Sequence, residues 1–141
     1  MKRRGFTLIE LIVVLTIISI SFGVLTLKFS IIDKIGAKNE IQTFVDDYSY
    51  LRDLSLSSGT INFIKFTDSG YILSGYKEKT RDLKYIKHLN TETITFAQNS
   101  YVSSKKNKEG YNLDFVSRKD PNIRWNFTIE PIGGYLSEKN K

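Results

Sequence analysis

A carboxylate stands near the start of a long apolar run, where a charge is costly. Three basic residues, Lys2, Arg3 and Arg4, lead through Gly5 into this run, and Glu10 follows within it. On membrane-insertion scales, a charge at the centre of a spanning helix costs about 2.5–3.5 kcal/mol. We therefore expect Glu10 to meet a cation; the alternative is a carboxylate that lies harmlessly at the level of the lipid headgroups.

Outside this run the sequence offers little catalytic chemistry. His88 is the only histidine, and the chain has no cysteine. Because no carboxylate cluster stands beside it, we expect His88 to be a surface or edge residue rather than a metal ligand or a base. No nucleophile elbow, HExxH motif, P-loop or dinucleotide fingerprint occurs. The sequence thus indicates no enzyme, no cofactor and no metal site.

Basic residues gather in three later segments and could contact phosphates. These segments are 77–88, 103–110 and 118–124, and the candidate DNA-binding residues in the last two are Lys105, Lys106, Lys108, Arg118, Lys119 and Arg124. If the segments converge, Tyr85 or Tyr101 is available to stack on bases. Acidic residues are interspersed throughout, so ordinary solvated loops are the favoured interpretation.

Net charge gives only weak support to an anionic partner. The chain of 141 residues has 21 Lys and Arg against 15 Asp and Glu, a formal charge of +6. Three of the basic residues lie in the first four positions, so loss of that leader would leave 18 against 15. A DNA-binding surface usually needs a clear basic patch. The length suits one modest domain plus an anchor.

An apolar helix is predicted for residues 6–29. The run is long enough to cross a bilayer, which takes about 20 residues, and its basic leader would stay in the cytoplasm. A secretory signal peptide is the alternative, but the run is longer than usual for one and residues 19–23 form a poor cleavage site. We predict a leader at 1–5, a membrane or filament-core helix at 6–29 and a soluble domain at 30–141.

The helical pattern continues as an amphipathic segment to about residue 58. Apolar residues recur there at three- and four-residue spacing, at Ala37, Ile41, Phe44, Val45, Tyr48 and Leu51. Asp46, Asp47 and Asp53 fall on the other side, and Arg52 interrupts the apolar stripe. No proline occurs before residue 121, so one continuous helix over 6–58 is expected.

Beyond residue 59 the pattern is that of short strands. Two strands, in 60–66 and 71–76, flank the turn signal TDSG and predict a hairpin. Further strands are expected in 93–97, 111–117, 123–130 and after the Gly133–Gly134 pair. The clearest alternation puts Ile123, Trp125, Phe127 and Ile129 on one face. The predicted fold class is α+β, with the amphipathic helix covering an antiparallel sheet.

The stretch KRRGFTLIELIVVL, residues 2–15, resembles the N-terminus of the type IV prepilins and the related pseudopilins. In that family a basic leader ends in glycine, followed by phenylalanine, an apolar run and a glutamate, which here are Gly5, Phe6 and Glu10. The resemblance implies that a prepilin peptidase cuts after Gly5 and that the new amine of Phe6 is methylated. It also implies that Glu10 pairs with the Phe6 ammonium of a neighbouring subunit.

The end of the chain carries a second resemblance. Residues 126–139, a strand, a glycine turn and a strand, are similar to the end of minor pseudopilins of the GspH/FimT and ComGD-like types. Many major pilins have a proline in the membrane helix and a disulfide-closed C-terminal loop, and this chain has neither. The departure favours a minor subunit.

The resemblance implies both partners and a location. The partners are the prepilin peptidase/methyltransferase, other pilin or pseudopilin subunits, an inner-membrane assembly platform and the membrane. The protein would be a single-pass cell-membrane protein with its C-terminal domain outside, and a cell-surface pilus or pseudopilus component after assembly. The expected function is that of a structural subunit in pilus biogenesis, DNA uptake or protein secretion. The alternative is a DNA- or surface-binding minor pilin at the filament tip.

Overall fold

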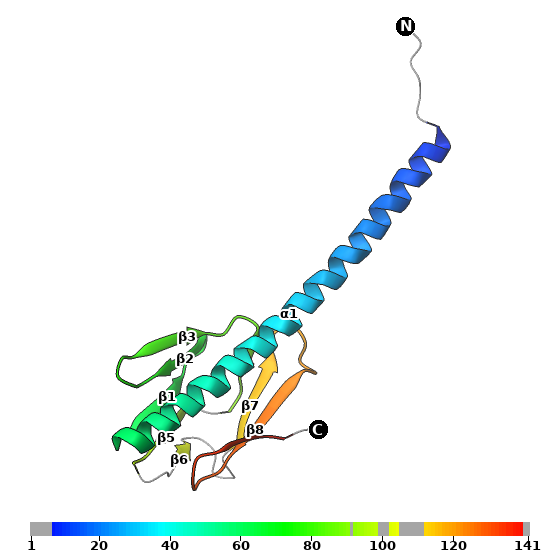
Figure 1. Cartoon of the computed structure of the whole chain (residues 1–141). Coiled ribbons are helices and arrows are strands. Elements are labelled where there is room, and N and C mark those ends of the chain that lie inside the picture. Colours follow the sequence, from blue (N-terminus) through cyan, green and yellow to red (C-terminus); the bar gives the residue numbers. More distant parts are fainter. Residues whose placement is uncertain (1–6, 91, 99–101, 105–111, 140–141) are drawn as a thin grey trace. The chain divides into compact units, whose positions relative to one another are not determined.

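The computed structural model describes residues 7–90, 92–98, 102–104 and 112–139, apart from the side chains of 24–30 and 104 (Figure 1). Among these residues there is one helix, α1, which runs from Leu8 to Ser58, close to the predicted range of 6–58. The chain forms two compact units, Met1–Ile35 and Gly36–Lys141.

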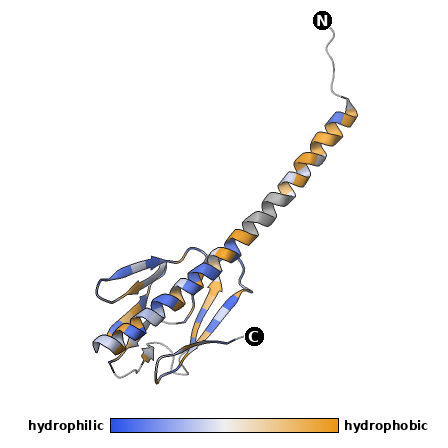
Figure 2. Cartoon of the chain, in the orientation of Figure 1, coloured by the Kyte–Doolittle hydropathy of each residue, from blue (hydrophilic) through white to orange (hydrophobic). Residues whose placement is uncertain are grey.

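The first unit consists of the apolar part of α1. Its described large hydrophobic side chains from Leu8, at 75%, to Phe22, at 65%, are exposed, and Figure 2 shows this part of the helix mostly in the hydrophobic colour. Nothing within the single chain covers these described side chains. Within the residues that the structure describes, no helical segment has both the length and the apolar character that a membrane span requires.

The described residues of the second unit form nine short strands in two antiparallel sheets. The five-stranded sheet has the order β3-β2-β1-β5-β6, made of Lys79–Asp82, Gly70–Leu73, Asn62–Phe66, Thr93–Phe96 and Val102–Ser104. The four-stranded sheet has the order β4-β7-β8-β9, made of Ile86–His88, Asn112–Ser117, Arg124–Ile129 and Leu136–Glu138. The predicted α+β class is confirmed, as is the hairpin of β1 and β2.

The single sheet expected from the sequence is in fact two. β4 pairs with β7, matching His88 with Phe115, rather than joining the strands that precede it. β3, made of Lys79–Asp82, was not predicted because its charged, largely exposed residues show no apolar alternation. The short β6 also lay outside the prediction, since three residues are too few to show a period.

The predicted helical stripe covers both sheets. Ala37, Ile41, Phe44, Tyr48 and Leu51 are buried, and so is Leu54, while Val45 packs partly buried against the core. The Phe44 ring lies 5.4 Å from the Tyr71 ring of β2 and 4.9 Å from the Phe115 ring of β7, measured between centroids. Phe44 of α1 therefore contacts both sheets. On β8, Phe127 and Ile129 are buried as expected, but Trp125 is only partly so.

Glu40 fastens the segment between β3 and β4 to the helix. Its carboxylate accepts hydrogen bonds from the backbone N–H groups of Lys84, Tyr85 and Ile86, at 2.7, 3.0 and 3.1 Å. Three successive N–H groups held by one carboxylate fix the path of the chain as it enters β4. This contact gives a physical reason for the separation of β4 from the first sheet.

Asp47 ties the helix to the hairpin of β2 and β3. The sequence pattern placed Asp47 on the solvent side, but its carboxylate accepts from the Tyr71 hydroxyl at 2.9 Å and from Arg81 Nε at 2.9 Å. Burial, together with the Asp47 charge and its hydrogen bond, raises the pKa of Tyr71. The hydrogen bond that Arg81 donates to Asp47 is the main cause that raises the pKa of Arg81. The Asp47 carboxylate therefore joins β2 and β3 to the helix through two charge-assisted hydrogen-bond partners.

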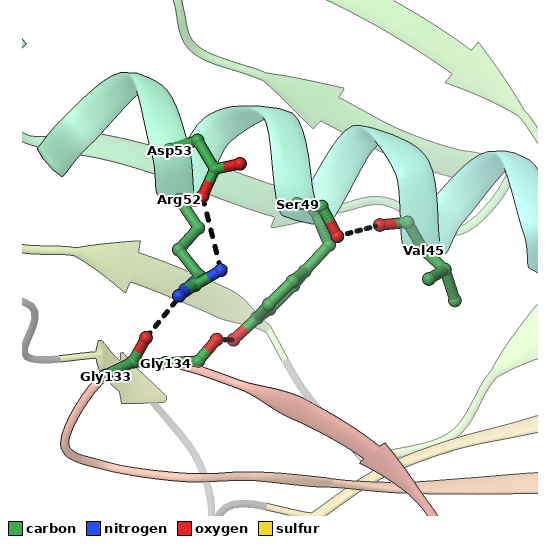
Figure 3. A network of polar contacts seen from close by, with 7 residues as sticks. Val45, Ser49, Arg52, Asp53, Gly133 and Gly134 are labelled. Atoms are coloured by element: carbon green, nitrogen blue, oxygen red, sulfur yellow. Dashed lines mark hydrogen bonds and ion pairs between the residues drawn. The ribbon is translucent and has the colours of Figure 1, made fainter. Parts of the chain in front are cut away.

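The C-terminal glycine turn is fastened to α1 by two side chains (Figure 3). The buried Tyr48 hydroxyl donates to the Gly134 carbonyl at 3.0 Å, and Arg52 Nε donates to the Gly133 carbonyl at 2.6 Å. The Arg52 guanidinium also lies 4.0 Å above the Tyr135 ring. Both glycines have positive φ, 85° and 61°. Arg52, which interrupts the apolar stripe, therefore serves to bind this turn.

Candidate functional site

The N-terminus of α1 begins with a capping box. Glu10 N donates to Thr7 Oγ1 at 3.3 Å, and Thr7 N donates to Glu10 Oε2 at 2.9 Å. The Thr7 hydroxyl also donates to Glu10 Oε2, at 3.1 Å. This reciprocal pairing satisfies N–H groups that the first turn of any helix leaves without an intrahelical acceptor. The helix consequently begins at Leu8, two residues after the predicted start.

The capping contacts use only one oxygen of the Glu10 carboxylate. Both Thr7 donors reach Oε2, and within the described part of the chain Oε1 accepts no hydrogen bond. A negative charge in the first turn also suits the positive end of the helix dipole. The geometry thus fixes Glu10 on the helix while leaving one oxygen free to receive a cation.

The polar side chains of the apolar segment are satisfied within the helix. Thr16, Ser19 and Ser21 each donate a hydroxyl hydrogen bond of 2.8 Å to the carbonyl four residues earlier. A hydroxyl bonded in this way needs no water, so it is tolerated in an apolar environment. Between Thr7 and Gly23, Glu10 carries the one charged side chain.

Several predicted site residues lie outside the described residues. They are the leader 1–5 with its terminal Gly5, the methylation site Phe6, and the candidate DNA contacts Lys105, Lys106 and Lys108. Tyr101, a candidate for base stacking, also lies there. The roles of these residues stay predictions.

The remaining basic candidates are described, and the two arginines make local contacts. Arg118 Nε donates to the Ile86 carbonyl at 3.0 Å, joining the end of β7 to β4. Arg124 Nε donates to the Pro121 carbonyl at 3.2 Å, and Lys119 is exposed. Tyr85, expected to be free for stacking, packs partly buried against the core.

His88 lies on β4, at the edge of the four-stranded sheet, as the prediction of an edge residue requires. Its ring is 4.7 Å from the Phe66 ring between centroids. No group of three or more potential metal ligands occurs among the residues that the structure describes.

The one residue of this site that the sequence analysis missed is Thr7. The signal was available, because a threonine followed three residues later by a glutamate, ahead of an apolar run, is the pattern of a capping box. The contact assigns Glu10 a role inside its own chain as well as the role implied between chains.

Together these features define a class of protein: an α+β domain whose helix starts as an exposed apolar segment with a capped, acidic first turn. Residues 1–26 match the family model described as the prokaryotic N-terminal methylation motif. The chain therefore carries the type IV prepilin signature, which implies processing by prepilin peptidase and assembly with other pilins. No curated protein and no solved structure matches the chain.

Proposed function

We propose that this protein is a minor structural subunit of a type IV pilus or pseudopilus, without catalysis of its own. The observation that carries the proposal is the methylation motif at residues 1–26. Prepilin peptidase would cut after Gly5, and the new amine of Phe6 would be methylated. The capping box begins at the next residue, Thr7, so the cut would fall just outside the first turn of the helix.

The uncovered apolar segment supports insertion and later assembly. Apolar side chains from Leu8 to Phe22 are exposed in the single chain and need a partner environment. Before assembly that environment would be the bilayer, with the basic leader cytoplasmic and the C-terminal domain outside. After assembly that environment would be the same segments of other subunits, which an inner-membrane assembly platform would bring together.

Glu10 would guide the incoming subunit. The ammonium that cleavage creates at Phe6 carries a positive charge into an apolar bundle, where an unpaired charge is costly. The unused Oε1 of Glu10 on a neighbouring subunit can accept it, while Oε2 keeps the capping contact. Charge pairing would thus set the register between subunits.

This subunit would serve one of three machines: a type IV pilus, a competence pseudopilus or a type II secretion pseudopilus. The resemblance of residues 126–139 to the GspH/FimT and ComGD-like types supports a minor subunit in one of them. The alternative of a tip subunit that binds DNA or a surface gains no support from Arg118 and Arg124, since their guanidinium groups contact backbone carbonyls.

The intact mass of protein sheared from filaments tests the proposal. We expect a chain that begins at Phe6 and carries one methyl group. The Gly5→Val variant adds a branched side chain at the cut and should stay at full length in the membrane, whereas wild type is processed. A mature chain that begins near residue 24 would instead identify an ordinary signal peptide.

A further inference from the structure

A groove lies between α1 and the segment that joins β2 to β3, within the second unit. Its volume is about 450 Å³, and its polar lining consists of Asp47, Tyr50, Ser74, Tyr76, Lys77 and Lys79. Gly75 forms part of its floor, where an added Cβ would lie 3.6 Å from a Leu51 methyl group. We call this the α1–β3 groove.

Two tyrosines in the groove are exposed and are not part of the packed core. Tyr50 is 55% exposed and Tyr76 is 82% exposed. Among the described residues, neither hydroxyl takes part in a hydrogen bond, and neither ring packs on another aromatic ring. Both rings are therefore available as flat apolar surfaces for a ligand.

The groove carries uncompensated positive charge. Its one carboxylate, Asp47, is neutralised by Arg81, whose Nε lies 2.9 Å away. Lys77 and Lys79 form no ion pair within the part of the chain that the structure describes. Glu78 stands between them in the sequence but does not line the groove.

The carboxylate and the serine hydroxyl of the groove already accept hydrogen bonds from the chain. Both carboxylate oxygens of Asp47 accept from Arg81, and Oδ2 accepts from Tyr71 as well. Ser74 Oγ accepts from the backbone N–H of Phe63 at 2.6 Å. What remains free is two ammonium donors and two tyrosines. A ligand that brings anionic acceptors and flat rings matches these groups.

We propose that the α1–β3 groove binds single-stranded nucleic acid. Lys77 and Lys79 contact phosphates, and Tyr50 and Tyr76 stack on bases, the combination that single-strand binding sites use. No free side chain is placed to identify a base by its edge, so the binding is independent of sequence. This site is separate from the six basic residues considered above, and it does not depend on whether the chain assembles into a filament.

The test is the affinity of the full chain, in detergent micelles, for a short labelled oligothymidylate, measured by fluorescence anisotropy at several salt concentrations. The Lys77→Ala/Lys79→Ala variant should bind at least about ten-fold more weakly. The slope of log K against log salt should become shallower by about 1.4, because each of the two lost phosphate contacts contributes about 0.7 in a single strand. The Lys84→Ala/Lys87→Ala variant removes the same charge from exposed positions outside the groove and should bind like wild type. Equal weakening of both variants would overturn the proposal.

Stacking has its own pair of variants. Tyr76→Ala should lower the affinity about five-fold or more, and Tyr76→Phe, which keeps the ring, should restore it. Circular dichroism should show the same fold in every variant, because the substituted side chains are exposed. Full affinity in Tyr76→Ala together with Tyr50→Ala would show that no base is stacked and would contradict the proposal.

Competitors separate the ligand sources. Unlabelled oligothymidylate should displace the probe at far lower concentration than inorganic polyphosphate, which has no bases, or than free thymidine monophosphate. Equal competition by polyphosphate, or by an acidic polysaccharide, would identify a general anion site and overturn the assignment. Equal competition by the mononucleotide, counted per nucleotide, would identify a free-nucleotide site instead of a strand.

Discussion

Glu10 combines two kinds of contact on separate oxygens of one carboxylate. Oε2 holds the backbone N–H and the hydroxyl of Thr7, and Oε1 is left without a partner in the described chain. The capping role stabilises the start of α1, and the charge role belongs to the proposed contact between subunits. Substitutions at residues 7 and 10 can separate the two, because glutamine can serve in a capping box without a charge.

We predict that Glu10→Gln is cleaved normally but fails to enter filaments. The amide oxygen can still accept from Thr7 N, and the cut site is untouched, so processing should proceed. A neighbouring Phe6 ammonium would lose its counter-ion, and stranding a buried charge costs about 3–5 kcal/mol. Comparison of membrane and sheared-filament fractions by immunoblot measures the effect.

The matched variant is Thr7→Val, which loses the cap and keeps the charge. It should weaken the helix start by about 1 kcal/mol and still enter filaments. If Glu10→Leu extends filaments as well as wild type does, Glu10 is not the assembly charge.

At the scale of elements, side chains of α1 fix connections whose own sequences are weak in pattern. Glu40 holds the entry to β4, Asp47 holds Tyr71 and Arg81 of the β2–β3 hairpin, and Tyr48 with Arg52 holds the glycine turn. The helix therefore fixes the connecting segments through hydrogen bonds and also covers the core.

Removal of the Glu40 carboxylate should destabilise the second unit. Glu40→Ala leaves three backbone N–H groups without their acceptor, two of them on half-buried or buried residues. Because an unsatisfied buried donor costs about 1–3 kcal/mol and water can reach Lys84, we expect a loss of about 2–4 kcal/mol in the free energy of unfolding. Urea unfolding followed by Trp125 fluorescence measures it. Glu78→Ala, which removes an exposed acid, is the control, and an equal loss there would refute the assigned role.

The glycine turn gives a second prediction at this scale. Gly134→Ala would combine a positive φ of 61° with a Cβ only 2.5 Å from a Val102 methyl group. Gly59→Ala has a similar φ of 64° but open space around the Cβ. Backbone strain should cost each variant about 1–2 kcal/mol, and the steric clash should make Gly134→Ala clearly the less stable. Equal melting temperatures would show that the turn moves freely to accommodate the methyl group.

At the scale of the whole molecule, the sheets depend on the helix for a complete core. The buried helical residues are Ala37, Ile41, Phe44, Tyr48, Leu51 and Leu54. Full burial of one large apolar side chain contributes about 1.5–3 kcal/mol, so the set contributes on the order of the 5–15 kcal/mol that stabilises a typical domain.

We therefore predict that residues 30–141 form a soluble monomer and that residues 59–141 aggregate. The shorter fragment would expose the apolar faces of both sheets to water. Sedimentation velocity and circular dichroism on the two fragments measure the difference. A folded, monomeric 59–141 fragment would contradict the view that α1 completes the core.

Local features of this protein could be determined from its sequence alone. The N-terminal motif, the helical stripe, the β1–β2 hairpin and the alternation of β8 are all patterns within a few residues of chain. Such patterns follow from backbone periodicity and turn chemistry, which need no distant partner. The same holds for the capping box of Thr7 and Glu10, which the sequence contained although it was not predicted.

The tertiary structure alone decided which distant residues meet. Glu40 lies 44 positions from Lys84, Arg52 lies 81 positions from Gly133, and Tyr48 lies 86 from Gly134. These contacts divide the strands into two sheets, explain a polar interruption in an apolar stripe and assemble the α1–β3 groove. No local pattern encodes such pairings, because a side chain's partner across the core depends on how the whole chain packs rather than on its neighbours in sequence.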